Sequence, residues 1–229
     1  MESRFKYICL SILLVLANNS YAQTIHKVFS ADSVTYYLQN STPVINKNIP
    51  AQYQNTIRVA LMYYPELSNV NIEFRVRKRV APLAARPTVW STFVKPSKRK
   101  YKVTISSSTI KFLTPILLHN LSFNAQVGVV GHELSHVSEY NSKRGLFFVE
   151  LALKHVSKRK IDRFEYATDE RCIRHGLGYQ LLSWSTEVRN KLTVNKWGGS
   201  SNLTPKHERY MNPATIVNTM GRLSIYNIK

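Results

Sequence analysis

The chain has 229 residues, with 32 Lys and Arg against 13 Asp and Glu, and a formal net charge of +19. Its length suffices for one domain with a sizeable hydrophobic core. Two cysteines are too few for a disulfide-built scaffold, and no apolar stretch is long enough to cross a bilayer as a helix.

The N-terminus has the pattern of a secretory signal peptide at residues 1–22. Basic residues precede an apolar run at residues 7–17, and a small-x-small cleavage site ends at Ala22. We therefore expect export to the periplasm or the cell exterior after cleavage near Ala22, leaving residues 23–229 as a single domain. Cys9 would leave with the signal, so Cys172 would have no intramolecular partner and is expected to be a small buried residue.

Helix and strand patterns follow in the first half of the mature chain. Residues 49–67 predict a helix that begins near Pro50 and ends at Pro65. Residues 71–80 alternate between apolar and charged side chains, which predicts a half-buried strand. The apolar members of that alternation are Ile72, Phe74 and Val76.

The next elements are shorter. Residues 82–87, bounded by prolines, predict a break between strands. Residues 89–94 and 101–107 predict two further strands. Residues 111–120 then predict a short helix before the most informative segment of the chain.

That segment carries His-Glu-x-x-His at residues 132–136, on a predicted helix that Ser122 or Asn124 can cap. His132 and His136 are four residues apart, so their imidazoles share one face and can bind the same metal ion. Glu133 is about a third of a turn from His132 and can deprotonate a bound water. These groups meet the needs of a zinc hydrolase. An apolar stripe at helical spacing favours a real helix over a chance match: Val127, Val130, Leu134 and Val137.

A third ligand is sought downstream, in a predicted helix at residues 161–176 that Gly176 ends. Glu165 and Asp169 are four apart and share a face, so one can ligate a metal while the other hydrogen-bonds a ligand histidine. The alternative is a solvated helix face of mixed charge. The residues expected to face inward are Phe164, Ala167, Cys172 and Ile173.

Other segments offer rivals or connections. Residues 145–155 are apolar enough to pack in the core or touch a membrane, and core packing is the default expectation. Glu150 within them is a rival third ligand, although no Asp follows it at helical spacing. Residues 178–191 predict another helix, and residues 197–201 a turn.

His-Glu-Leu-Ser-His followed by Glu-Tyr-Ala-Thr-Asp resembles the gluzincin metallopeptidases, whose pattern is HExxH and then ExxxD on a second helix. Within that clan it is most similar to the CAAX prenyl-endopeptidase family and its soluble envelope relatives, which carry HExxH and ExxAD. The resemblance covers roughly residues 122–180. It implies that His132, His136 and Glu165 bind one zinc ion per chain, that Glu133 is the catalytic base and that Asp169 orients a ligand histidine, His132.

The resemblance also implies a fold: an α+β, zincin-like metallopeptidase domain. A small, mostly antiparallel sheet would pack on the HExxH helix, and a mainly helical C-terminal part would follow. In such folds an exposed edge strand can bind substrate backbone by strand addition, and residues 101–107 are expected to be that strand. The chain departs from the pattern at Thr168, where the family usually has Ala, and this position is expected only to pack the helix.

Residues 203–211 lie where family members often carry a His-Pro element and a downstream Arg. Thr204 replaces that His, so the usual transition-state donor is missing. His207, Arg209 and Tyr210 can substitute by stabilising a tetrahedral oxyanion, and His207 is the residue we expect to do so. The alternative for His207 is an exposed histidine in a charged loop.

The excess of basic residues is concentrated in three clusters, at residues 75–79, 95–102 and 154–160. An exported protein is not expected to meet nucleic acid, so acidic lipid, lipopolysaccharide or wall polymer is the expected anionic partner, unless the charge is only solvated surface. The sequence thus predicts an exported zinc-dependent endopeptidase that hydrolyses peptide bonds with a zinc-activated water and a Glu general base. Two alternatives stay open: an envelope-binding protein with a zincin fold and little activity, and a zinc amidase acting on cell-wall peptides.

Overall fold

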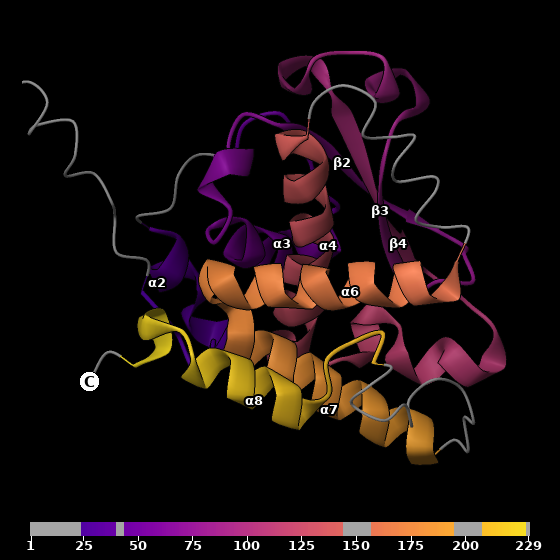
Figure 1. Ribbon diagram of the computed structural model, residues 1–229. Coiled ribbons are helices and arrows are strands. Elements are labelled where there is room, and N and C mark those ends of the chain that lie inside the picture. The colour runs from indigo at the N-terminus through magenta and orange to yellow at the C-terminus, as the bar shows by residue number, and fades with distance from the viewer. Residues whose placement is uncertain (1–23, 40–43, 144–156, 195–207, 228–229) are drawn as a thin grey trace, which may run out of the picture.

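The computed structural model of the protein describes residues 24–39, 44–143, 157–194 and 208–227. A small sheet lies on one side of a long helix, α4 (Phe123–Ser142), and other helices surround the rest of it (Figure 1). The structure is therefore α+β, as expected. The predicted signal peptide lies outside the described residues, and none of the helices within them is long and apolar enough to cross a membrane.

The sheet is mixed, with the strand order β1-β2-β4-β3. Its strands are β1 (Lys47–Asn48), β2 (Asn71–Arg77), β3 (Leu83–Pro87) and β4 (Lys100–Ser106). β1 and β4 both run parallel to β2, and only β3 runs antiparallel to its neighbour β4. The expectation of a mostly antiparallel sheet is therefore wrong. The chain passes from β2 to the far edge, forms β3 and returns as β4 between them, which makes β2 and β4 parallel.

Two predicted strand positions are also wrong. Residues 82–87, predicted as a break, contain β3, because an edge strand tolerates a proline at its end. Residues 89–94, predicted as a strand, form a 3₁₀ turn, η4 (Val89–Thr92). Residues 101–107 largely coincide with β4, but this strand is paired on both sides and cannot accept another strand. β3 is the edge strand beside α4.

The predicted helix at residues 49–67 is present in pieces. Its centre is α3 (Gln54–Leu61), which packs on α4, and 3₁₀ turns lie on either side of it. The short predicted helix at residues 111–120 is two 3₁₀ turns separated at Leu117, whose backbone is extended; Pro115, inside the first turn, lacks the backbone donor that a continuous α-helix needs. The remaining short elements before α4 are η1 (Ala31–Ser33), α2 (Val34–Leu38), η2 (Ala51–Tyr53), η3 (Pro65–Leu67), η5 (Pro96–Lys98), η6 (Lys111–Ile116) and η7 (Leu118–Asn120).

Helix α4 begins as predicted, with the Ser122 hydroxyl accepting a hydrogen bond from the Ala125 backbone N–H at 3.4 Å. Asn124 instead holds the N-terminal segment, bonding both backbone groups of Phe29. The predicted apolar stripe is fully buried: Val127, Val130, Leu134 and Val137. Because α4 is enclosed by α3, α6, α7 and β3, its histidines also lie inside the molecule.

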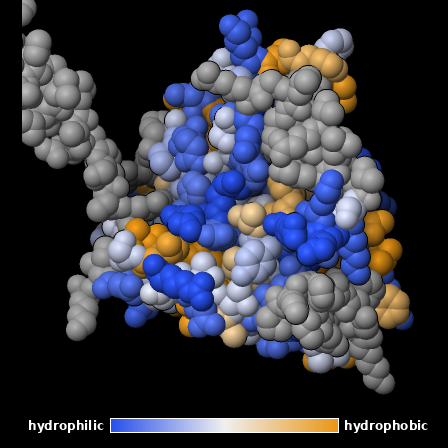
Figure 2. Space-filling model, in the orientation of Figure 1, coloured by the Kyte–Doolittle hydropathy of each residue, from blue (hydrophilic) through white to orange (hydrophobic). Residues whose placement is uncertain are grey.

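After residues 144–156, which lie outside the described residues, the described chain is helical. This agrees with the expected helical C-terminal part. Helix α6 (Lys158–Cys172) crosses α4 and presents a largely hydrophilic outer face (Figures 1 and 2). Gly176 lies inside the π-turn η8 (Ile173–Leu177) and has φ +90°. The helix axis changes direction at this residue, so the predicted helix ends there as expected. Three elements follow: α7 (Gly178–Val194), α8 (Pro213–Gly221) and η11 (Ser224–Tyr226).

Candidate metal centre

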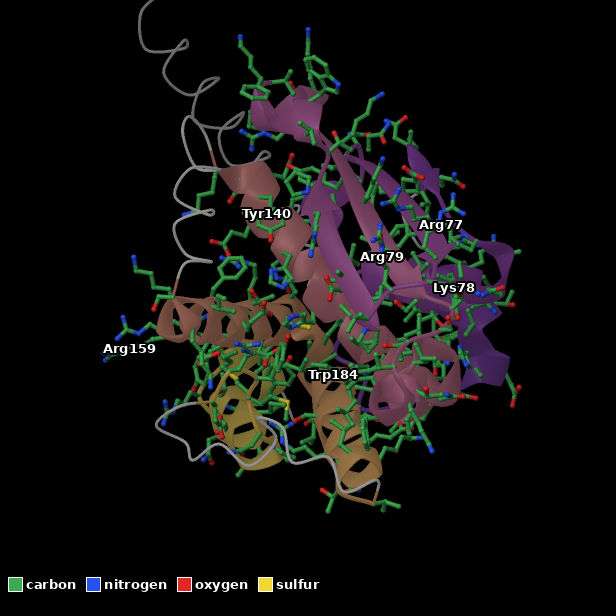
Figure 3. The ribbon with its side chains drawn as sticks, turned by 90° about the vertical axis from the view of Figure 1, so that its right-hand side faces the viewer. Arg77, Lys78, Arg79, Tyr140, Arg159 and Trp184 are labelled. Atoms are coloured by element: carbon green, nitrogen blue, oxygen red, sulfur yellow. The ribbon has the colours of Figure 1, made fainter. Side chains whose placement is uncertain are left out.

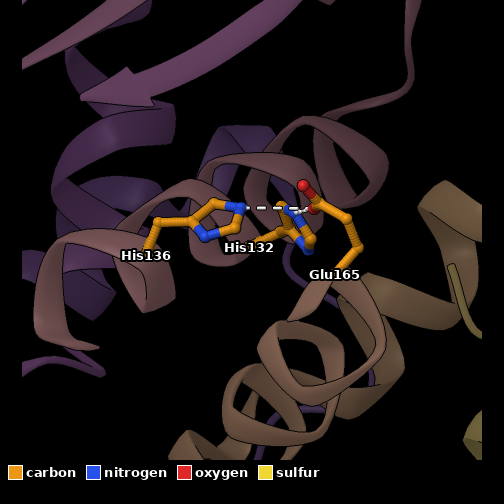
Figure 4. A group of neighbouring side chains, drawn as sticks. All are labelled: His132, His136 and Glu165. Carbon is orange, nitrogen blue, oxygen red and sulfur yellow. Dashed lines mark hydrogen bonds and ion pairs between the residues drawn. The ribbon is translucent and has the colours of Figure 1, made fainter. Parts of the chain in front are cut away.

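Three side chains from two helices converge at the crossing of α4 and α6 (Figure 4). Nε2 of His132 lies 3.2 Å from Oε2 of Glu165, and Nε2 of His136 lies 3.3 Å from the same oxygen. The three donor atoms all lie within 4.8 Å of one another. The tertiary structure thus brings together the three residues that the sequence suggested as ligands, and this group could hold a metal ion.

The separations of Glu165 Oε2 from the two histidine nitrogens fit a small, four-coordinate ion. Ligand bonds of 2.0–2.1 Å in a tetrahedron place neighbouring donors about 3.4 Å apart. The two nitrogen–oxygen distances, 3.2 and 3.3 Å, are close to that value. Two imidazoles and a carboxylate also match the donor set of a catalytic zinc site, which keeps one position open.

Asp169 fixes the first histidine. One of its carboxylate oxygens lies 2.7 Å from Nδ1 of His132, and the other accepts the backbone N–H of Met211 at 2.7 Å. Asp169 is completely buried and accepts the Nδ1 proton, so Nε2 is the nitrogen of His132 that can take a cation, either a proton or a metal ion. Burial alone would lower the pKa of His132, but the Asp169 and Glu165 carboxylates outweigh it and hold the pKa well above its ordinary value.

Thr168 fixes the second histidine, a role that its sequence position did not indicate. Its hydroxyl donates to the Phe164 carbonyl at 2.9 Å and lies 3.3 Å from Nδ1 of His136. A hydroxyl has one proton, so the contact with His136 has Nδ1–H as donor and the Thr168 oxygen as acceptor. The expectation that this position only packs the helix is therefore wrong. Of the residues expected to face inward, Phe164, Cys172 and Ile173 are buried as predicted, whereas Ala167 is exposed and its neighbour Thr168 is buried instead.

With both Nδ1 atoms protonated, both Nε2 lone pairs face the Glu165 carboxylate. Three acceptors so close together repel one another unless a cation, either a proton or a metal ion, lies among them. Burial raises the pKa of Glu165, but its two histidine neighbours outweigh this and hold the pKa well below its usual range. The arrangement is therefore chemically suited to a bound cation.

Glu133 is held beside these ligands by the sheet. Its Oε2 accepts the backbone N–H of Ala85, in edge strand β3, at 2.6 Å. Only 7% of Glu133 is exposed, and burial raises the pKa of its carboxyl group. Because Ala85 uses Oε2, the Glu133 side chain has a fixed direction and its second oxygen remains available to a water or substrate.

A pocket of about 360 Å³ opens beside the centre and is lined by His132 and Glu133. Its far wall is mostly apolar and comes from η6, η7 and α7. Trp184 projects from α7 towards α4, and its ring centroid lies 5.7 Å from that of His132 (Figure 3). The other apolar lining residues are Ala81, Pro82, Leu83, Leu113, Ile116, Leu118, Leu121, Val129, Val188 and Leu192.

The three residues considered as oxyanion donors differ in how they lie relative to the metal centre. His207 lies outside the described residues. Arg209 lines the pocket, but its Nε donates to Asp162 at 2.6 Å, which commits part of the guanidinium to an ion pair. Tyr210 lies with its ring centroid 5.6 Å from His132. Burial around its hydroxyl and the nearby Glu165 carboxylate raise the pKa of Tyr210, so its phenol stays protonated and can donate.

Several site contacts were not predicted. Trp184 lies in residues 178–191, which were predicted only as a helix, and the Ala85 backbone N–H belongs to a segment expected to be a break. Every residue except proline has a backbone N–H, so no residue type in the sequence could have indicated this contact. The rival ligand Glu150, with residues 145–155 around it, Thr204 and the turn at residues 197–201 all lie outside the described residues.

Comparisons with protein-family models, curated proteins and solved structures find no match for this chain. The interpretation of the centre therefore rests on its own geometry.

Proposed function

We propose that this chain is a zinc-dependent endopeptidase of the gluzincin type. The observation that carries the proposal is the convergence of Nε2 of His132, Nε2 of His136 and Oε2 of Glu165, with the buried Glu133 beside them and an open pocket in front. A structural metal site would be closed by four protein ligands, whereas three come together here among the described residues, and one of them, His132, lines the pocket beside Glu133.

Zinc bound here would supply a Lewis acid that polarises the scissile carbonyl and makes water a stronger nucleophile at neutral pH. Glu133, fixed by the Ala85 N–H, takes the proton of the attacking water on its free oxygen and delivers it to the leaving amine nitrogen. Tyr210 is the described residue best placed to donate a hydrogen bond to the carbonyl oxygen as it gains negative charge.

Edge strand β3 is suited to align an extended substrate. Its neighbour β4 occupies one side, and its other side leads to Glu133 through Ala85 and to the pocket through Leu83. An extended polypeptide can add to such an edge by backbone hydrogen bonds. The apolar wall around Trp184 and Val188 would then accept a bulky apolar side chain of the substrate. This favours peptide hydrolysis over the amidase alternative.

The test compares metal content and cleavage of an unfolded protein by the parent, Glu133→Gln and Glu165→Gln. We expect zinc in the parent and in Glu133→Gln, cleavage by the parent alone, and loss of zinc in Glu165→Gln. Glu170→Gln is the matched control, since Glu170 lies on the same helix but, among the described residues, forms its ion pair with Arg174 at the surface. It should keep both zinc and activity.

Two results would reject the proposal: a parent that retains no zinc, or cleavage by Glu133→Gln at the parental rate. Zinc retention without cleavage of any polypeptide would instead support the envelope-binding alternative, and release of wall peptides alone would support the amidase. Export after cleavage near Ala22 belongs to the same proposal, and N-terminal sequencing of the secreted chain tests it.

A further inference from the structure

The connection between β3 and β4, residues 88–99, forms an exposed projection that we call the β3–β4 tip. Three of its apolar residues are largely exposed: Val89 at 77%, Trp90 at 81% and Phe93 at 81%. Figure 2 shows apolar atoms together with hydrophilic ones at the top of the molecule, where Figure 1 places this connection. Large apolar side chains grouped in this way mark interaction sites more often than single exposed ones do.

The backbone of the tip is held in place, so the exposure of its aromatic rings is a property of the fold. Ser91, between the two aromatic residues, is 1% exposed. Its hydroxyl donates to the Lys100 carbonyl at 2.8 Å and accepts the Lys100 N–H at 2.7 Å. Thr88 also donates its backbone N–H to the Lys100 carbonyl at 2.9 Å. Trp90 and Phe93 therefore project from an ordered turn.

The base of the tip is tied to the helix of the metal centre. Arg99 is 3% exposed, and its Nη1 donates to the carbonyls of Tyr140 and Lys143 at 2.6 and 2.7 Å. These carbonyls lie at the C-terminal end of α4, where a cation is stabilised by the helix dipole. Arg99 Nε also donates to the Val94 carbonyl at 3.2 Å, inside the tip. The tip and α4 should thus move as one unit.

Exposed lysines surround the apolar group: Lys95, Lys98 and Lys100. Among the residues that the structure describes, none of the three makes an ion pair with a carboxylate. The chain contains no Asp or Glu between Glu73 and Glu133, so the whole hairpin is cationic. The tip therefore combines exposed aromatic rings with positive charge that has no local counter-charge.

We propose that the β3–β4 tip docks this protein on the surface of an anionic lipid bilayer. Trp90 and Phe93 enter the headgroup layer, where aromatic rings are favoured, and the three lysines face acidic headgroups. A soluble polyanion would be bound by the lysines alone and would leave the exposed rings without a role. The bilayer accounts for both features.

Docking through the tip has a consequence for the metal centre. β3 begins at Leu83, which lines the pocket, and ends at Pro87, where the tip starts. Five residues of extended strand span about 17 Å, so the pocket lies within roughly that distance of the start of the tip. The site would then face polypeptide segments near the membrane surface.

The experiment is co-sedimentation with vesicles of phosphatidylcholine alone or with about one quarter phosphatidylglycerol, at low and high salt. Two variants test the tip: Trp90→Ser with Phe93→Ser, and Lys95, Lys98 and Lys100 each replaced by Gln. The matched control replaces Arg77, Lys78 and Arg79 by Gln. This control removes as many exposed charges at the other end of β2, away from the tip (Figure 3).

We expect the parent to bind the acidic vesicles, weakly at high salt, and not the neutral ones. Each tip variant should lower the partition coefficient roughly tenfold, and the control by less than about twofold. Retention on heparin should fall for the lysine variant alone. Metal-free protein should bind vesicles as the parent does, which separates this proposal from the proposed hydrolase. Thermal melting checks that each variant is folded.

Three results would overturn the proposal. The first is a parent that does not bind acidic vesicles. The second is parental binding by the variant without Trp90 and Phe93, which would indicate simple polyanion binding. The third is an equal loss in the control at Arg77, Lys78 and Arg79, which would indicate a diffuse effect of net charge.

Discussion

The hydroxyl oxygen of Thr168 lies 3.3 Å from Nδ1 of His136. The next residue, Asp169, lies 2.7 Å from Nδ1 of His132. The two imidazole planes are 88° apart, and adjacent residues of α6 each contact one ring. One turn of α6 therefore supplies a candidate ligand, Glu165, and the orienting groups for both histidines.

Replacing Thr168 with Val should weaken zinc binding roughly tenfold, because valine has a similar shape but cannot accept the Nδ1 proton of His136. Competition with a chelator of known affinity measures the change. Thr168→Ser is the matched control and should bind zinc nearly as the parent does. Equal affinity in the Val variant would show that the Thr168 contact does not support the ligand.

Replacing Asp169 with Asn should reduce both zinc affinity and stability. Asp169 accepts from two donors, Nδ1–H of His132 and N–H of Met211, whereas Asn has one accepting oxygen and would face one donor with its own NH₂ group. We expect a 10- to 100-fold loss of affinity. Urea unfolding of the metal-free protein should show a loss of about 1–3 kcal/mol. Unchanged unfolding would mean that the side chain rearranges to satisfy both donors.

Replacing Tyr210 with Phe tests its role as hydrogen-bond donor. The ring packs between His132 and Trp184, and Phe keeps these contacts. If the hydroxyl stabilises the oxyanion, kcat should fall about 10²-fold while KM and zinc content stay near parental values. Steady-state kinetics with a fluorogenic peptide measures this. A change in KM alone would instead make Tyr210 a substrate-binding residue.

Replacing Gly128 with Ala should destabilise the fold. A Cβ at Gly128 would lie 2.2 Å from the Gln180 carbonyl oxygen, so α4 and α7 would have to separate. We expect a loss of about 1–3 kcal/mol in the free energy of unfolding. Gly221→Ala is the control, because a Cβ there meets nothing within 4 Å and should leave stability unchanged or slightly higher. Urea unfolding of both variants decides the comparison, and equal stabilities would contradict the packing argument.

Local features of this protein follow from its sequence, because helical periodicity and capping depend on residues a few positions apart. The pairing of His132 with His136, the Ser122 cap and the end at Gly176 are of this kind, and the structure agrees with all three. Spacing also placed Glu165 and Asp169 on one helix face, and the resemblance, not the spacing, assigned Glu165 as the ligand and Asp169 as its supporting carboxylate.

Only the tertiary structure decided which strands pair, which helix face Thr168 lies on and which backbone N–H holds Glu133. Each depends on contacts between residues far apart in the chain. β3 is a strand because β4 offers its hydrogen bonds, although its flanking prolines indicate a break. Likewise, α6 packs on α4 with the face that carries Glu165. Thr168 lies three residues later on that same face, so it is buried.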